Sequence, residues 1–407
     1  MLRRHSTKAL VALVTAAPVL DAAALWRDQI SPFVSEVVTR DDNVFRLADG
    51  VDPLLAIGAP SAKDTYQATS AGVGFDVPVA AQRLEGEVAV NRYHFNTFNE
   101  LDFNGYGARA VWRWRVGERF SGDLGHDRSE ALASLSNVQS GSRSTTPNVI
   151  KTERSYVTAT YDLAAHWQVR GDLRNASQRN DASQYKPNDL DAHSTEFTLA
   201  YVTGQMTRVG VISQNVDGHL PNPELLGAVR LNNSYGQQSV AAFIEWQPSP
   251  HSQLKARAGS TRRDYDVIPQ RNFDGSVYVA TMDWRPTDNV TLTAIRQRDI
   301  SPYEEINIGL VLSDGVGFHS LWNIREKAAV AVELESADRT YLGDAASFLG
   351  TAAPYSERVR SVGAKLSLHP RKLVTVDVGW RHERRSSLTT LGSYAAGIAT
   401  VGFRFAF

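Results

Sequence analysis

The chain has 407 residues, of which 42% are hydrophobic and 21% are charged, and its formal net charge is −1. This length allows one large domain or two ordinary ones, and charges of both signs spread along the chain provide no basic face for a nucleic-acid partner. The absence of cysteine excludes disulfides, iron–sulfur clusters and thiolate zinc sites.

The N-terminal segment has the composition of a secretory signal peptide. A basic start over residues 1–8 precedes an apolar stretch over 9–20, and three alanines at 22–24 form a small-residue cleavage site. The apolar stretch is shorter than the roughly 20 residues that a membrane helix needs. We therefore expect residues 1–24 to be a cleaved signal peptide and residues 25–407 to form the mature domain.

The mature chain alternates apolar and polar residues almost throughout. In LVTVDVGWRHE, for example, Val374, Val376, Val378 and Trp380 share one face and polar residues occupy the other, which is typical of a strand with one apolar face. This pattern predicts an all-β protein with strands near 30–46, 65–77, 82–97, 101–116, 119–130, 152–163, 166–179, 193–204, 206–216, 235–247, 252–266, 275–285, 289–300, 306–322, 326–340, 356–369, 372–386 and 392–407.

The turns between these segments alternate between two lengths. Short turns such as QPSPHS, RPTDN and HPRK are separated mostly by long polar segments such as 134–148, 217–233 and 342–354. Short periplasmic turns and long extracellular loops are typical of outer-membrane barrels. We therefore predict a transmembrane antiparallel up-and-down β-barrel of about 18 strands, with 16 as the alternative, in the outer membrane of a Gram-negative bacterium.

Aromatic residues support this prediction at two places. The tryptophans that lie beside short turns are expected to form an aromatic girdle at the inner membrane interface; they are Trp112, Trp114, Trp167, Trp246, Trp284 and Trp322. The chain ends in ATVGFRFAF, where Phe403, Phe405 and Phe407 share one face. This ending resembles the C-terminal signature that the barrel assembly machinery recognises, whereas a buried last strand of a secreted sandwich is the alternative.

If the apolar face contacts lipid, the polar face lines a lumen. An outward Arg or Lys would cost about 2–4 kcal/mol at the membrane midplane, so the charged strand residues are expected to face inward. The predicted lumen-lining residues are Glu85, Glu87, Arg109, Arg113, Arg115, Asp123, Asp127, Arg170, Asp172, Arg174, Lys255, Arg257, Asp283, Arg285, Glu333, Glu335, Lys365, Asp377, Arg381 and Arg404. Charges of both signs favour a neutral or zwitterionic hydrophilic cargo such as a glycan, unless they pair across the lumen and close it.

The sequence gives no sign of catalysis. The motifs GxSxG, GxxxxGK[ST] and HExxH are absent, and the ten histidines lack metal-ligand spacing. We therefore expect no enzyme activity, no cofactor and no metal. A siderophore-type transporter is also disfavoured, because strand-like alternation begins near Ile30 and leaves no room for a plug domain.

The segment ISPFVSEVVTRDDNVFRLADG, residues 30–50, contains the cluster Asp41, Asp42, Asn43, Phe45 and Arg46. As a calcium loop it is poor, because its acidic residues are consecutive rather than alternate. We interpret it as the outer end of the first strand, at the barrel rim. The segment resembles the EpsL family of outer-membrane barrels encoded with exopolysaccharide operons, whose early motif reads like YDDNLFRL. Here arginine replaces the usual aromatic residue and valine the first leucine.

The resemblance implies a role in exopolysaccharide export, with the glycan and periplasmic export proteins as partners besides outer-membrane lipid. The mechanism expected is passive guidance along a wall of cationic and anionic side chains. Two alternatives remain open: a general or nutrient porin for small hydrophilic solutes, and a structural scaffold for export partners.

Overall fold

The computed structural model describes residues 29–133, 147–163, 166–203, 207–226, 229–231, 234–301, 308–344, 355–387 and 392–407. The predicted signal peptide, residues 1–24, lies outside these ranges. No helix in the described ranges is long and apolar enough to cross a membrane.

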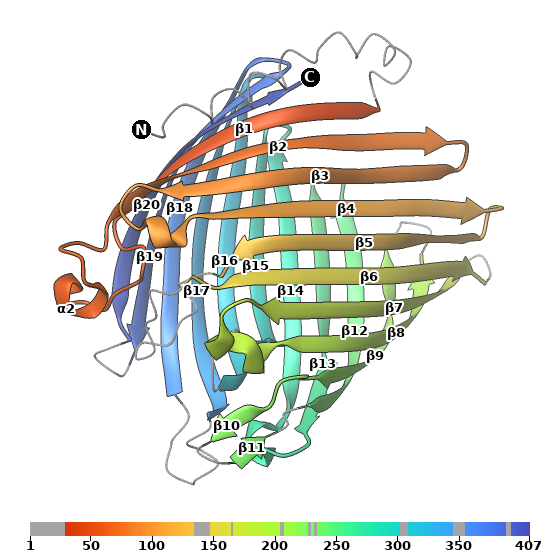
Figure 1. Cartoon of the computed structure of the whole chain (residues 1–407). Coiled ribbons are helices and arrows are strands. Elements are labelled where there is room, and N and C mark those ends of the chain that lie inside the picture. Colours follow the sequence, from red (N-terminus) through yellow and green to blue (C-terminus); the bar gives the residue numbers. More distant parts are fainter. Residues whose placement is uncertain are drawn as a thin grey trace.

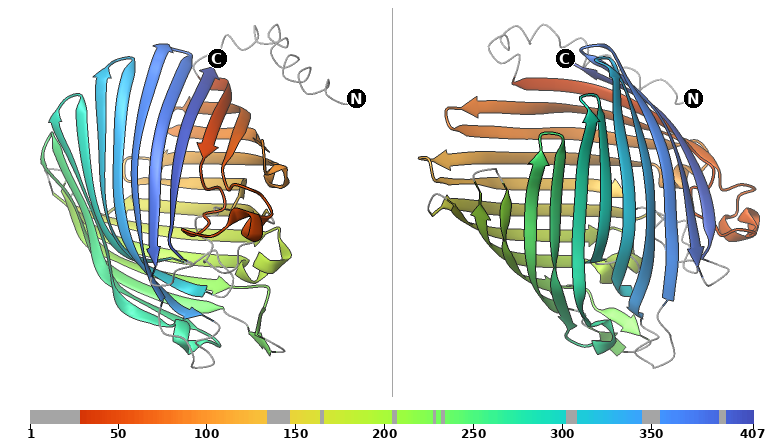
Figure 2. Two further views of the ribbon diagram at one scale, coloured as in Figure 1. Left: turned by 90° about the vertical axis from the view of Figure 1, so that its left-hand side faces the viewer. Right: turned by 180° about the vertical axis from the view of Figure 1, so that it is seen from behind.

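Eighteen antiparallel strands form one sheet that closes on itself (Figure 1). The first strand, β1 (Ile30–Asp41), pairs with β2 (Asp64–Val79) on one edge and with the last strand, β20 (Tyr394–Ala406), on the other. Figure 2 shows β1 beside β20, where the two ends of the chain complete the barrel. No strand edge is left unpaired in this sheet, as crossing a bilayer requires.

Each remaining barrel strand pairs with its neighbours in chain order. They are β3 (Gln82–Phe95), β4 (Phe103–Val116), β5 (Phe120–Leu132), β6 (Val149–Asp162), β7 (Trp167–Asn180), β8 (Leu190–Val202), β9 (Arg208–His219), β12 (Tyr235–Ser249), β13 (Ser252–Tyr265), β14 (Phe273–Thr287), β15 (Val290–Ser301), β16 (Ile308–Arg325), β17 (Ala328–Asp344), β18 (Tyr355–Arg371) and β19 (Val374–Ser387). The predicted all-β barrel is confirmed with 18 strands rather than 16, and each predicted strand overlaps an observed one.

The connections sort by length between the two ends of the barrel. Turns of two to five residues, such as Ala80–Ala81 between β2 and β3, occur at the end where β1 begins. The opposite end carries the longer connections, which contain α2 (Pro53–Ile57), η2 (Asn99–Leu101), η4 (Ser183–Asn188), η5 (Pro269–Arg271) and the small hairpin of β10 (Glu224–Leu226) and β11 (Val229–Leu231). In outer-membrane barrels the short turns are periplasmic, so the long connections lie on the extracellular side.

Two clusters of buried hydrophobic residues lie near the extracellular end. One cluster packs Val44, Phe45 and Leu47 against Phe95, Phe98 and Leu101. A second packs Phe273, Val277, Ile300 and Leu310. Large apolar side chains elsewhere on the strands are exposed, including Val88, Leu124, Leu173 and Phe197. Such exposure suits a wall whose outer face contacts lipid.

Candidate functional site

Ion pairs between strands that are not neighbours identify the inner face of the barrel. Arg404 of β20 lies 3.6 Å from Glu87 of β3, across two intervening strands. Arg381 of β19 lies 3.7 Å from Glu335 of β17, across one. Side chains of a closed sheet converge only on its concave face, so these four residues point into the lumen. Side chains alternate between the two faces along a strand. The pairing register therefore assigns a face to all the remaining strand residues, except where the register shifts.

The register places all but one of the predicted lumen-lining residues on this inner face. They are Glu85, Glu87, Arg109, Arg113, Arg115, Asp123, Asp127, Arg170, Asp172, Arg174, Lys255, Arg257, Asp283, Glu333, Glu335, Lys365, Asp377, Arg381 and Arg404. The exception is Arg285, which follows a register shift after Trp284, so alternation does not assign its face. That the predicted lumen-lining residues contact a solute stays a prediction.

The ion pairs on the inner face run along the wall. Arg113 lies 3.1 Å from Glu85 on the neighbouring strand, and Arg170 lies 2.8 Å from Asp172 on its own strand. Among the described residues, the luminal pairs join strands at most three positions apart. Exposed pairs of this kind contribute about 0–1 kcal/mol each to stability. Their main effect is to present closely spaced charges of both signs to whatever enters the lumen.

Two concave regions of the inner wall differ in charge. One, of about 290 Å³, is lined by Glu335, Arg339, Arg381 and Glu383 on β17 and β19, and therefore offers both signs. The other, of about 350 Å³, is lined by Arg170, Arg208, Lys255 and Arg257 together with Glu245, and is mainly cationic. Within the described chain, Lys255 and Arg257 form no ion pair, so both remain available to an anionic group.

A buried ion pair supports the first concave region from the extracellular side. The guanidinium of Arg385 contacts the carboxylate of Glu357, and the two side chains are 1% and 0% exposed. Tyr341 donates a hydrogen bond of 2.5 Å to the same carboxylate. Similarly, Tyr394 donates one of 2.5 Å to Glu383. The sequence analysis missed these residues, although the alternating acidic and basic residues of RHERR, with Glu383 and Arg385 on the face of Arg381, contain the signal.

The predicted rim motif forms a clamp at the seam between β1 and β20. Asn43 Nδ2 donates hydrogen bonds to the carbonyls of Leu47 (2.9 Å) and Ala395 (3.0 Å), and its Oδ1 accepts one from Leu47 N–H (2.7 Å). Asp42 Oδ1 accepts a hydrogen bond of 2.7 Å from the N–H of Gly397. Two consecutive residues of the motif therefore bind the last strand.

The remaining motif residues hold the loop that follows. Arg46 Nη1 lies 2.9 and 2.8 Å from the two carboxylate oxygens of Asp41. Phe45 is 4% exposed and packs edge-to-face against Phe98, with ring centroids 4.7 Å apart. The motif thus lies at the rim as expected, but β1 ends at Asp41 rather than near residue 46, so most of the motif belongs to the loop.

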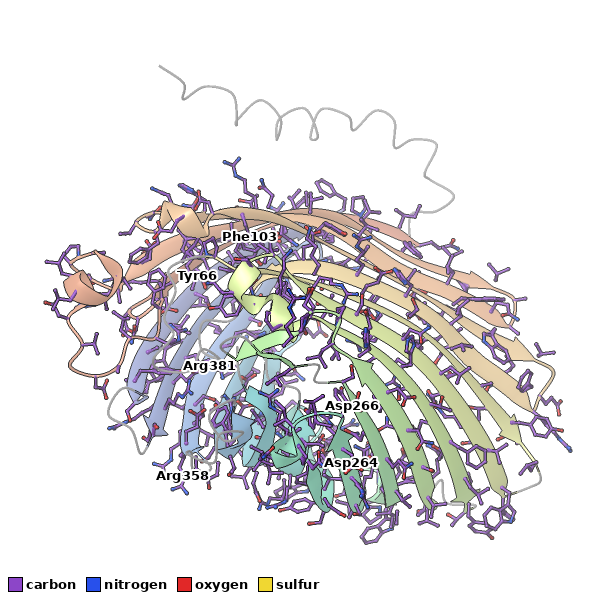
Figure 3. All side chains as sticks on the ribbon, turned by 60° about the horizontal axis from the view of Figure 1, so that its bottom comes forward. Tyr66, Phe103, Asp264, Asp266, Arg358 and Arg381 are labelled. Carbon is purple, nitrogen blue, oxygen red and sulfur yellow. The ribbon has the colours of Figure 1, made fainter. Side chains whose placement is uncertain are left out.

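An aromatic pocket of about 240 Å³ lies next to this clamp on the inner face. Tyr93 stacks on Phe103 with ring centroids 4.5 Å apart, and Tyr66 stacks on Phe95 at 4.6 Å. Figure 3 shows Tyr66 and Phe103 close together near the first strands. Arg46 also lines this pocket, so the clamp and the mouth of the lumen share a residue.

The aromatic residues predicted to face lipid or the interface lie as follows. Trp112, Trp167, Trp246, Trp284 and Trp322 are between 44% and 50% exposed, whereas Trp114 is half-buried and packs against Phe120. Phe403 and Phe405 face outward on β20, and Phe407 packs on Phe405 with ring centroids 4.6 Å apart. Membership of a girdle and recognition by the assembly machinery stay predictions.

No group of histidine and acidic residues among the described residues has the geometry to hold a metal ion. The motif carboxylates are instead engaged by Arg46 and by backbone N–H groups.

Comparison with known proteins relates the chain to outer-membrane channels by fold. No protein-family model and no curated protein sequence matches it. The outer membrane protein opdK from Pseudomonas aeruginosa is similar in structure, with a TM-score of 0.50 at 10% identity, covering 93% of this chain and 100% of that one. P. aeruginosa OccK9 (OpdG) has a TM-score of 0.50 at 10% identity, with 93% and 98% covered.

The structure of P. aeruginosa OccK2 (OpdF) in complex with glucuronate has a TM-score of 0.50 at 12% identity, covering 93% of this chain and 98% of that one. At such low identity the likeness concerns the fold alone. The chain therefore has the fold of an 18-stranded outer-membrane porin.

Proposed function

We propose that the protein is a passive outer-membrane channel for small hydrophilic solutes. The observation that carries the proposal is the luminal wall, where charged side chains of both signs face inward from strands around the whole circumference. A barrel of 16 to 18 strands leaves an aqueous channel when loops do not fill it. The porin fold of the similar structures supports the same reading.

The chemistry of the wall favours small polar solutes that can exchange hydrogen bonds quickly. Glu335, Arg339 and Arg381 offer donors and acceptors within one concave region, whereas Lys255 and Arg257 offer donors that no described carboxylate pairs with. A zwitterion or a sugar acid can interact with both regions. OccK2, which shares the fold, has been crystallised with the sugar acid glucuronate, so glucuronate is a suitable first probe.

Planar-bilayer recording and vesicle swelling test the proposal. The purified, folded protein is expected to give a steady conductance in potassium chloride and to admit small sugars and sugar acids into vesicles. Vesicles containing the same protein inactivated by heat are the control. A folded protein that gives neither conductance nor solute entry would refute the channel.

A second candidate is a role in exopolysaccharide export, favoured by the likeness of the segment 30–50 to the EpsL motif. The clamp offers a structural reason for this motif, because Asp42 and Asn43 join β1 to β20. Export would be supported if a polysaccharide fraction blocked the conductance reversibly and if luminal substitutions at Arg113, Arg257 and Arg381 stopped secretion at normal protein level. If deletion of the gene stopped secretion but these substitutions did not, the protein would instead act as a scaffold.

A further inference from the structure

The outer face of the barrel carries a group of arginines near the extracellular end of β18 and β19. Arg358 and Arg360 alternate with the inner-face residues Glu357 and Ser361, and Arg384 lies between Glu383 and Arg385. All three arginines are exposed. Figure 3 shows Arg358 at the outer edge of the wall. We name Arg358, Arg360 and Arg384, with the neighbouring His382, the outer arginine patch.

Two residues of the outer arginine patch face each other, and neither forms an ion pair in the described part of the chain. Arg360 of β18 and Arg384 of β19 are direct partners in the strand register. Like charges directly opposite on neighbouring strands destabilise the pairing. Arg358 lies 2.6 Å from Asp338, but no acidic residue in the described part of the chain forms an ion pair with Arg360 or Arg384. A shared anion between the two guanidinium groups would remove their repulsion.

An apolar groove adjoins the two arginines. The groove has a volume of about 500 Å³, and its lining includes Val316, Phe318, Leu334 and Val362. The register orders these residues by height in the wall. Val316, Ser336, Arg360 and Arg384 occupy one row across the strands, and Phe318, Leu334, Val362 and His382 occupy the next row toward the short turns. The groove therefore changes from cationic to apolar in the direction of the membrane interior.

Two outward cations on the opposite part of the wall have nearby partners. On β5 and β6, Lys151 lies 3.4 Å from Glu130, and Arg128 lies over the ring of Tyr106 at 5.6 Å from its centroid. Both residues face outward near the extracellular end, as the arginines of the patch do. Arg360 and Arg384 differ from Lys151, which has a carboxylate partner, because neither forms an ion pair in the described part of the chain.

We propose that the outer arginine patch and the groove below it bind a phosphorylated, acylated glycolipid of the outer leaflet, of the lipid A type. A phosphate lies between Arg360 and Arg384, which can each donate two hydrogen bonds to it. An acyl chain follows Val362, Leu334 and Phe318 toward the membrane centre. The long connections place this sector in the outer leaflet, which is why we assign a glycolipid rather than an inner-leaflet phospholipid.

Native mass spectrometry of the protein, purified in detergent and titrated with diphosphoryl lipid A, tests the proposal. The Arg360→Gln/Arg384→Gln variant is expected to bind lipid A at least about tenfold more weakly than the wild type, because charge-assisted hydrogen bonds to phosphate are lost. The matched control, Arg128→Gln/Lys151→Gln, removes two outward cations from the other sector and should bind as the wild type does. Lipid A without phosphates should bind the wild type about as weakly as diphosphoryl lipid A binds the patch variant.

A second variant keeps the charges and fills the groove. Val362→Trp should weaken lipid A binding while inorganic phosphate still protects the arginines from modification by a guanidine-specific reagent. The shift between heated and unheated samples on a denaturing gel verifies that each variant is folded. Equal lipid A binding by the wild type and by folded Arg360→Gln/Arg384→Gln would overturn the proposal, and so would phosphatidylglycerol binding as tightly as lipid A.

Discussion

Substitution of Asn43 tests whether the rim motif acts as a clamp on the barrel seam. In the wild type its side chain makes three hydrogen bonds, two to Leu47 and one to the carbonyl of Ala395 on the last strand. A hydrogen bond contributes about 0.5–1.5 kcal/mol net, so Asn43→Ala should lower the free energy of unfolding by about 2–4 kcal/mol. The carbonyl of Ala395 would also lose a partner in a half-buried position.

The free energy of unfolding can be measured by urea titration of the protein in lipid vesicles, followed by tryptophan fluorescence. Asn43→Asp separates the two functions of the side chain, because it keeps the acceptor for Leu47 N–H but removes both donated hydrogen bonds. It should therefore also be destabilised. Asp49→Ala is the matched control: Asp49 is exposed, and only its backbone binds across the seam, to Ser393.

The reasoning would be refuted if Asn43→Ala and Asp49→Ala unfolded at the same urea concentration with the same slope. An equal decrease in the free energy of unfolding in both variants would indicate that the loop as a whole, rather than the Asn43 side chain, stabilises the seam.

Three further predictions follow from the wall of the barrel. Arg385→Leu should cost about 3–5 kcal/mol of unfolding free energy, because the buried carboxylate of Glu357 loses its nearest cation and keeps only Arg339 at 3.8 Å. Arg381→Gln, on the open wall, should cost less than about 1 kcal/mol. Urea titration distinguishes the two variants, and equal losses of unfolding free energy would contradict the assignment. Gly86→Val should destabilise the sheet by about 1–3 kcal/mol, because a Cβ at this position would lie 2.4 Å from a backbone oxygen of the next strand. Gly107 has open space around it, so Gly107→Val should be tolerated in the same titration. Arg257→Glu should shift the reversal potential in a potassium chloride gradient toward cation preference, and an unchanged potential would show that this concave region lies off the ion path.

The strand pattern could be predicted because each strand separates two different environments. Lipid on one side and polar side chains on the other enforce a period of two, so Val376, Val378 and Trp380 already indicate a face, and short turns such as 288–289 mark the strand ends. The end of β1 was predicted too late, at residue 46, because Val44 and Phe45 continue an apolar pattern that the structure uses for a loop cluster.

The contacts of the candidate site were harder to predict because they depend on how the barrel closes. Alternation alone assigns Arg404 and Glu87 to one face, but only the closed sheet brings residues so distant in sequence to 3.6 Å. Likewise, the motif was recognised as a rim segment, yet its partner strand could not be read from the sequence. The outward arginines were missed because every strand charge was expected to face the lumen, and this expectation fails for Arg358, Arg360 and Arg384 near the extracellular end.

The pairing of the first and last strands has a consequence for the order of folding. Asp42 and Gly397 are 355 residues apart, and bringing together the ends of a flexible segment of that length costs about 5 kcal/mol of chain entropy. Strands made in sequence avoid most of this cost, since each new hairpin adds to an existing edge. The clamp can therefore form only when β20 reaches β1, at the closing step of the barrel. A sheet that lacks β20 leaves one edge of β1 without its hydrogen-bond partners, so the clamp marks the closed barrel.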